Sequence, residues 1–332
     1  MRKDVEILDK SFVHFLLLNG YSQANSGLMY GKLGISLSLF EASRLCHDEM
    51  VEGYAYDLLS EALASSIIDY SFDNGKAGIA WAILYLINGQ YIDADYQELY
   101  SSEHDSLIEF LKKTERIDAT QSIHCLSFLL IAEFYITPKD FEDIWNKLSD
   151  IIVESYGKEV KEGFEDFYSN SAKIIGLYNF YKDKRPFLKP LVEAVVRASC
   201  KIQEDGYVCN CLAFAVELLT YGMKCGKSDM ISLADSVIQT YFSNMLIEII
   251  DYKTSVDILY YIRRLADLRD KEEYSAIEYR VKALLQDKES HLFYWADRQA
   301  LSELKRGITR FVWLESSEME DWSPEKHIIM LQ

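Results

Sequence analysis

The residues best suited to chemistry in this sequence are a cysteine pair and a histidine–cysteine pair. Cys209 and Cys211 flank Asn210, and His124 directly precedes Cys125. A catalytic zinc takes three such thiolate or imidazole ligands and leaves a fourth position open. If the helices that begin at these two pairs start at the same rim of the fold, the pairs together supply three zinc ligands. Against this, cysteine is often a small buried apolar residue, and a lone histidine is readily explained as a capping or half-buried side chain.

Acidic residues in turns indicate a second chemistry. Asp73, Asp257 and the pair Glu204–Asp205 fall in or near turns that precede apolar helices. Paired carboxyl groups perform general acid–base catalysis in glycoside hydrolases, including toroidal ones. The helix dipole alone also favours acidic residues at helix N-termini, so capping explains the same residues. No G-x-S-x-G, Walker A or H-E-x-x-H motif occurs.

Two glycine-rich turns must position these residues. Gly31 and Gly34 open one apolar helix, and Gly75 and Gly78 open another, after an Asn–Gly turn that marks a chain reversal. Asp73 is expected to be the N-cap of the second helix. Glycines three residues apart lie on one helical face, where the missing side chains let another backbone approach closely. That approach offsets the roughly 1 kcal/mol that each glycine costs in helix propensity.

The glycine turns belong to a longer repeat. Amphipathic helices are predicted over residues 5–19 and 49–70, each followed by a turn and a more apolar helix. Small residues recur at the predicted start of each second helix, in steps of 44, 50, 46, 40 and 44 residues: Gly31, Gly75, Cys125, Ser171, Cys211 and Ser255. This period is typical of helical-hairpin arrays. A seventh copy would use residues 274–285 and 297–304, and Thr309–Leu314 has the composition of a short strand.

The repeat predicts one all-α domain over residues 1–332, an α/α toroid of six or seven helical hairpins. The second helices carry few charges, and the segment Ile79–Ile87 carries none, so both faces of these helices are expected to be buried. Burial on both faces favours a closed ring, with these helices inside and the amphipathic ones outside.

Composition narrows the classes of function. The chain has 332 residues, of which 49% are hydrophobic, enough for a sizeable core. Its formal net charge of −18 argues against sequence-independent nucleic-acid binding. An acidic surface serves solubility or attracts a basic peptide. The apolar run Phe12–Leu18 is too short to span a bilayer, and no signal segment is recognised. Six cysteines without disulfide-dense spacing predict a reducing cytoplasm.

The segments GLMYGKLGISLSLFE and NGKAGIAWAILYLINGQYID resemble the glycine repeats of the lanthionine synthetase C-like family. The resemblance is specific in the first two repeats and only periodic afterwards. It implies an α/α toroid of seven hairpins with G-x-x-G at the starts of the inner helices. The family's cyclases bind zinc through one cysteine beside a glycine motif and a Cys-His pair in the next repeat. Their zinc activates a peptide thiol for addition to a dehydrated serine or threonine, and a nearby histidine transfers protons.

The zinc ligands implied by the resemblance are incomplete in this sequence. Cys209 matches the family's first cysteine, but Cys211 and Phe214 stand where glycines are expected. No W-C-H-G motif occurs, and the dipeptide Cys46-His47 follows the first inner helix instead of opening one. We therefore expect no zinc, with a set of Cys209, Cys211 and His124 as the alternative.

The resemblance implies a role in ribosomal peptide modification of the lanthipeptide type. We expect a pseudoenzyme without zinc catalysis that binds a peptide or a partner modification enzyme. The alternatives are an active enzyme, either a divergent zinc-dependent thioether cyclase or a carboxylate-based toroidal hydrolase, and a purely structural interaction module. The expected binding residues lie at one acidic rim: Asp73, Asn74, His124, Ser171, Cys209, Asn210, Cys211, Ser255 and Asp257. A basic or polar peptide would suit this rim, and its binding would weaken as salt rises.

Overall fold

A computed structural model of the chain describes residues 10–65, 67–114, 117–157, 164–181, 187–204, 211–245, 252–269, 274–285, 304, 308–316 and 324–331. All regular elements in these ranges are helices. Backbone contacts divide the chain into two compact units. Unit 1 comprises residues 1–116, 124–144 and 288–322, and unit 2 comprises residues 117–123, 145–287 and 323–332. The prediction of a single domain stays a prediction.

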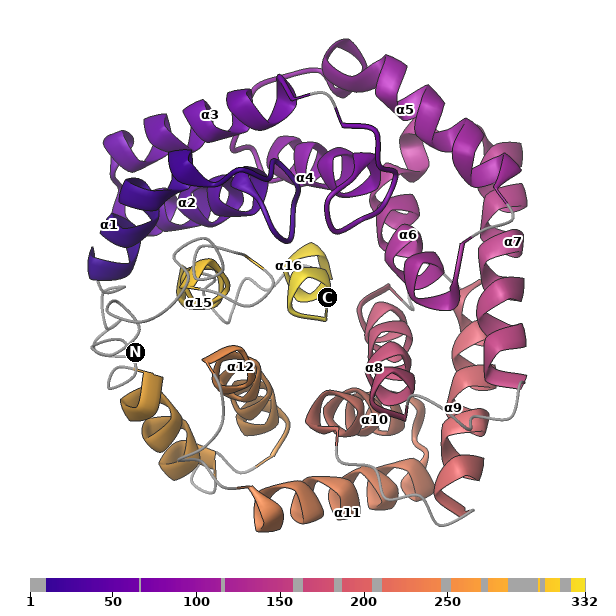
Figure 1. The fold of residues 1–332 in the computed structure, drawn as a ribbon. Helices are drawn as coiled ribbons and strands as arrows, with labels where there is room; N and C mark the ends of the chain where they lie inside the picture. Colours follow the sequence, from indigo (N-terminus) through magenta and orange to yellow (C-terminus); the bar gives the residue numbers. More distant parts are fainter. Residues whose placement is uncertain are drawn as a thin grey trace. The chain divides into compact units, whose positions relative to one another are not determined.

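Unit 1 is built from successive antiparallel helices at the N-terminal end of the chain and one helix that returns from its far end. Its helices are α1 (Lys10–Asn19), η1 (Gly20–Ser22), α2 (Lys32–Cys46), α3 (Glu49–Leu63), α4 (Lys76–Asn88), α5 (Tyr96–Lys113), η2 (Glu133–Tyr135) and α15 (Ile308–Ser316). The helices α6 (Ala119–Ala132) and α7 (Pro138–Gly157) belong in part to each unit. In Figure 1, α3 lies alongside α2 and α5 alongside α4.

Unit 2 continues the same alternation. Its helices are α8 (Phe164–Tyr181), α9 (Leu188–Glu204), α10 (Leu212–Cys225), α11 (Ser228–Asn244), α12 (Tyr252–Leu268) and α16 (Pro324–Leu331). Residues 274–285 are also helical. The helix α10 packs against α8, α11 and α12, while α9 and the returning helix α16 pack against α8. No helix in the described ranges is long and apolar enough to cross a membrane.

The two predicted kinds of helix are both present. The helix α4 buries every residue from Ala77 to Leu86, and α2 buries every residue from Leu33 to Ser43. The helices α3 and α5 bury only one face each. On α5 that face is Tyr96, Tyr100, His104, Leu107 and Leu111. Burial on all sides or on one side follows the sequence pattern, because a helix with few charged residues has no face suited to water.

The glycine motifs make the close contacts predicted for them. A Cβ atom added to Gly78 would overlap the carbonyl oxygen of Phe72, and one added to Gly34 would overlap that of Leu28. The Gly34 Cβ would also lie 2.7 Å from the Cβ of Leu304. In both repeats the carbonyl six residues upstream therefore rests on the glycine, because no side chain keeps it away.

Some predicted boundaries are wrong. The helix α3 ends at Leu63 instead of continuing to residue 70. Thr309–Leu314 is helical, not a strand, and lies within α15. Val312, Trp313 and Leu314 of this helix are fully buried, and Ser38 Oγ donates to the Thr309 carbonyl at 3.2 Å. Tertiary burial here overrides the strand propensity of a β-branched and aromatic run. The second helix of the seventh hairpin lies outside the described residues, apart from Leu304.

Two of the six predicted helix starts are misplaced as well. Cys125 lies in the second turn of α6, which begins at Ala119, and Ser171 lies two turns inside α8. Cys211 is the N-cap of α10, and Ser255 lies in the first turn of α12. The small residues therefore do not all mark the start of a helix. Serine and cysteine are tolerated inside a helix, where a glycine would weaken it.

A buried ionic cluster joins three helices of unit 2. Arg264 on α12 forms an ion pair with Glu217 on α10, whose side chain is fully buried. The Arg264 Nη2 atom also lies 3.3 Å from Thr220 Oγ1. Asn179 on α8 donates to Glu217 Oε2 at 2.8 Å and to the Glu217 carbonyl at 2.9 Å. Removing one member would leave a buried charge without its partner, which is far more costly than the pair is stabilising.

The contact at Gly78 can be tested with a matched pair of glycines. Gly78→Ala should lower the free energy of unfolding by more than the usual ~1–3 kcal/mol of overpacking, because its Cβ meets backbone that cannot rotate away. Gly53→Ala, in the exposed middle of α3 with nothing within 4 Å of the added Cβ, should instead raise it by up to about 1 kcal/mol. Urea unfolding of both variants measures the difference. Equal stability of the two variants would contradict the close-contact role.

His104 gives unit 1 a pH dependence of stability. Its Nδ1 lies 2.9 Å from the hydroxyl of Tyr96, and burial lowers the pKa of the imidazole below 6.5. Above that pH the residue is neutral in both states, so its native interactions are fully present. As pH falls below it, the unfolded chain takes up the proton first and stability is lost. His104→Gln should therefore flatten the decline in unfolding free energy between about pH 7.5 and 5. His14→Gln, exposed on α1, is the control and should leave the decline unchanged.

Candidate functional site

The turn before α4 places Asp73 and Asn74 at the start of that helix. The amide of Lys76 donates to the Asp69 carbonyl at 2.9 Å, and the amide of Gly75 donates to the Ser71 carbonyl at 3.1 Å. Gly75, not Asp73, is the N-cap residue, so the predicted capping role of Asp73 is wrong. With its carboxylate not used as a cap, Asp73 is available for contacts beyond its own helix.

The equivalent turn of the first repeat packs directly on this one. The Lys32 amide of that turn donates to the Asn25 carbonyl at 2.9 Å. Lys76 makes the same bond to Asp69, and in both turns the acceptor lies seven residues before the donor. The amide of Met29 donates to the Asp73 carbonyl at 2.8 Å, and Asn25 Nδ2 donates to Asn74 Oδ1 at 3.1 Å. These bonds fix the backbone on both sides of the Asp73 side chain.

The Asp73 carboxylate faces His124 on α6. Asp73 Oδ1 lies 3.7 Å from His124 Nδ1, where the two side chains are 25% and 9% exposed. The ring centroids of Phe72 and His124 lie 6.1 Å apart, and the two ring planes are tilted by 56°. A carboxylate beside a largely buried imidazole orients the ring, and the pair can hold a polar ligand or move a proton. Two residues predicted from different repeats thus meet in unit 1.

Two other predicted binding residues are buried. Ser171 is fully buried; its hydroxyl lies 3.1 Å from that of Tyr156 and 3.2 Å from that of Ser199. Ser255 is also fully buried. The predictions for these two residues as binding residues are not supported by their burial, because a side chain closed off by helix packing cannot reach a ligand.

Unit 2 has its own small cluster at the starts of α10 and α12. Burial raises the pKa of the Tyr241 hydroxyl to about 12, and the Cys211 thiol and the Asp257 carboxylate add to that rise. Both predicted residues therefore lie near Tyr241 on α11. Cys209 and Asn210 lie outside the described residues.

The described residues do not fit a three-ligand zinc site. Among them, no group of three or more His, Cys, Asp or Glu side chains lies close enough to hold a metal ion. His124 and Asp73 supply two donors, and the neighbouring Cys125 is buried, with 3% exposure. A catalytic zinc needs three protein ligands, and the described residues bring only these two donors together.

Phe72 and Asn25 lie in the two turns beside the pair, and neither is among the predicted site residues. The signal was present in the alignment of the two turns, NSGLMYG at residues 25–31 and DYSFDNG at residues 69–75. Asn25 then matches Asp69 as the carbonyl acceptor, and Leu28 matches Phe72 as the residue above the glycine. In the sequence only the glycines have an obvious steric meaning, because a missing Cβ leaves space for another backbone.

No protein-family model matches the sequence, and no curated protein does so either. Among solved structures, the chain is similar to nisin cyclase, with a TM-score of 0.65 and 13% sequence identity, over 97% of each chain. At this identity the likeness shows the fold alone. It confirms the predicted all-α fold class, since nisin cyclase is an α/α toroid, and the resemblance to the lanthionine synthetase C-like family at the level of the fold.

Proposed function

We propose that this protein takes part in the modification of ribosomal peptides of the lanthipeptide type and acts there by binding a peptide. The Asp73–His124 pair is the binding site, and the protein works without zinc. The peptide binds either as a free substrate or while it is bound to a partner modification enzyme.

One observation supports the proposal most strongly. A fold shared with nisin cyclase over nearly the whole chain places the carboxylate of Asp73, in the second glycine turn, 3.7 Å from the imidazole of His124 on α6. An imidazole that is 9% exposed beside a carboxylate suits the binding of a polar group or the transfer of a proton, which favours a binding role over a purely structural one.

The charge and thiol content of the chain agree with this role. With a net charge of −18, a lysine- or arginine-containing peptide is attracted over a distance set by the Debye length, about 10 Å in 0.1 M salt. The described cysteines are not joined in disulfides: Cys46, Cys125, Cys200, Cys211 and Cys225. We therefore place the protein in a reducing cytoplasm, where thiol-containing peptides also stay reduced.

Peptide binding is tested with a fluorescein-labelled synthetic peptide that contains one cysteine, one dehydroalanine and two lysines. Asp73→Asn and His124→Gln should each weaken binding about tenfold by fluorescence anisotropy, because a tenfold loss corresponds to one good polar contact. Asp105→Asn on the exposed face of α5 and His14→Gln remove the same groups elsewhere and should change affinity less than about twofold. Raising the salt concentration should weaken wild-type binding. Equal losses in the control variants would contradict the site.

The zinc-free assignment has a separate test. The purified protein should contain zinc well below one equivalent by elemental analysis, and it should not accelerate the loss of free thiol from the same peptide, followed by iodoacetamide labelling. Stoichiometric zinc that is lost in Cys209→Ser and Cys211→Ser but kept in Cys225→Ser would establish the alternative, a divergent zinc-dependent thioether cyclase using Cys209, Cys211 and His124. Hydrolysis of a glycoside that requires Asp73 and Asp257 would instead establish the carboxylate-based hydrolase.

A further inference from the structure

A second surface of the protein has the opposite charge from the acidic chain as a whole. A cavity of about 630 Å³ in unit 2 is lined by α9 and the beginning of α11. We call it the α9–α11 groove. The residues that line it are Glu193, Val196, Arg197, Cys200, Lys201, Lys227, Asp229 and Met230. Three of these side chains are cationic and two are anionic, in a chain that has 35 basic and 53 acidic residues.

The two acidic side chains of the groove leave part of its positive charge uncompensated. Lys227 Nζ donates to the Tyr221 hydroxyl at 2.9 Å. That bond raises the pKa of Lys227, and the Glu193 carboxylate adds to the rise. Asp229 lies in the first turn of α11, where the helix dipole already favours a negative charge. The negative charge of Glu193 is thus stabilised by Lys227, and that of Asp229 by the dipole of α11.

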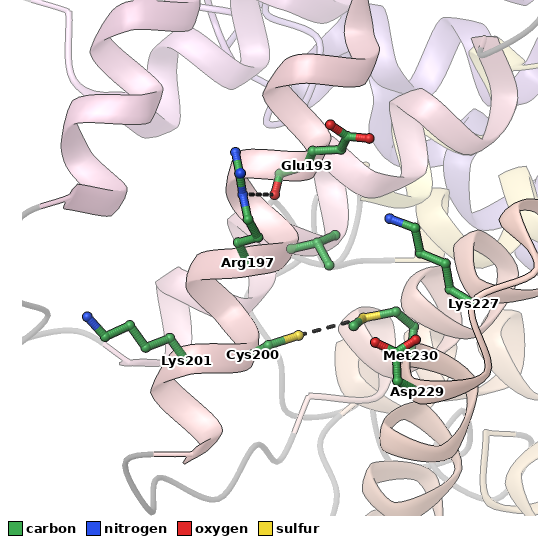
Figure 2. Close-up of a pocket in the computed structure, with 8 residues that line it drawn as sticks. Glu193, Arg197, Cys200, Lys201, Lys227, Asp229 and Met230 are labelled. Carbon is green, nitrogen blue, oxygen red and sulfur yellow. Dashed lines mark hydrogen bonds between the residues drawn. The ribbon is translucent and has the colours of Figure 1, made fainter.

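Arg197 and Lys201 are not compensated in this way. They lie four residues apart on the exposed side of α9, an arrangement of like charges that destabilises a helix by a few tenths of a kcal/mol. Arg197 Nε donates to the backbone carbonyl of Glu193 at 3.2 Å, not to its carboxylate. Figure 2 shows the Glu193 carboxylate pointing away from the guanidinium. Among the residues whose side chains the structure describes, no ion-pair partner is found for either cation. The planar guanidinium of Arg197 suits bidentate binding of a carboxylate.

The floor of the same groove is apolar and deformable. Cys200 Sγ lies 3.6 Å from Met230 Sδ across the groove, and Val196 beside them is buried. Methionine adapts its shape to different apolar partners. Cations on one side and adaptable apolar atoms on the other match a peptide that carries both a carboxylate and an apolar side chain.

We propose that the α9–α11 groove docks an acidic peptide segment with apolar side chains between its carboxylates. A glutamate or aspartate of the segment binds Arg197 and Lys201, and a neighbouring apolar side chain packs on Val196, Cys200 and Met230. Charge complementarity selects this occupant, because the rest of an acidic protein surface repels it. The proposal stands apart from the Asp73–His124 site, which lies in unit 1 and favours a basic segment.

The test uses the full-length protein and a fluorescein-labelled decapeptide of alternating glutamate and leucine. Arg197→Glu and Lys201→Glu should each weaken binding by about tenfold or more, because each replaces an attractive contact with a repulsive one. Lys189→Glu is the matched control. It makes the same charge change on the exposed face of α9 outside the groove, and its affinity should stay within about twofold of wild type.

Two further probes decide the chemistry of the occupant. Met230→Gln should weaken binding of the glutamate–leucine peptide but not of hexaglutamate, because only the first peptide uses the apolar floor. The proposal is overturned if wild-type protein does not bind the glutamate–leucine peptide, if Lys189→Glu loses as much affinity as Arg197→Glu, or if inorganic phosphate displaces the peptide at equal concentration. Asp73→Asn should leave this binding unchanged, so failure of the groove and failure of the Asp73–His124 site are distinguishable.

Discussion

A carbonyl oxygen resting on a glycine is the contact on which unit 1 depends. The oxygens of Leu28 and Phe72 occupy the space that a Cβ atom would take at Gly34 and Gly78. This approach folds each turn back over the first turn of its own helix. It also leaves the amides of Lys32 and Lys76 pointing at carbonyls seven residues upstream, so the backbone groups that begin each helix are satisfied without a side-chain cap.

The two turns pack directly against each other. Because both have the same shape, Met29 can donate to the Asp73 carbonyl, and Asn25 can reach Asn74. The consequence reaches the candidate site, since the Asp73 side chain emerges from backbone held on both sides. Lys32 with Glu61 and Lys76 with Glu103 add a matching ion pair from each inner helix to the next outer helix. A site placed by rigid backbone can hold an imidazole and a carboxylate at a defined distance.

Unit 2 achieves the same kind of helix pairing by different means. Its repeats lack the paired glycines, and its inner helices are joined by buried polar side chains. Glu217, Arg264 and Asn179 connect α8, α10 and α12, while Ser171 and Ser199 connect α8 and α9. Such contacts need only one suitable side chain on each helix, and many residue combinations satisfy them. The fold can therefore persist after its sequence motif has disappeared, which agrees with 13% identity to nisin cyclase over 97% of both chains.

The sequence by itself determined the helical class, the hairpin period and the role of Gly34 and Gly78. These follow from local rules, namely apolar periodicity and the space that a missing Cβ leaves. It also brought Asp73 and His124 forward as candidates. Only the tertiary structure decided that these two meet while Ser171 and Ser255 are buried. The helical state of Thr309–Leu314 was likewise not evident from the sequence, nor was the lack of an ion-pair partner for Arg197 and Lys201 among the described side chains. Each of these features depends on which side chains from distant parts of the chain contact one another. The local sequence pattern contains no information about such contacts.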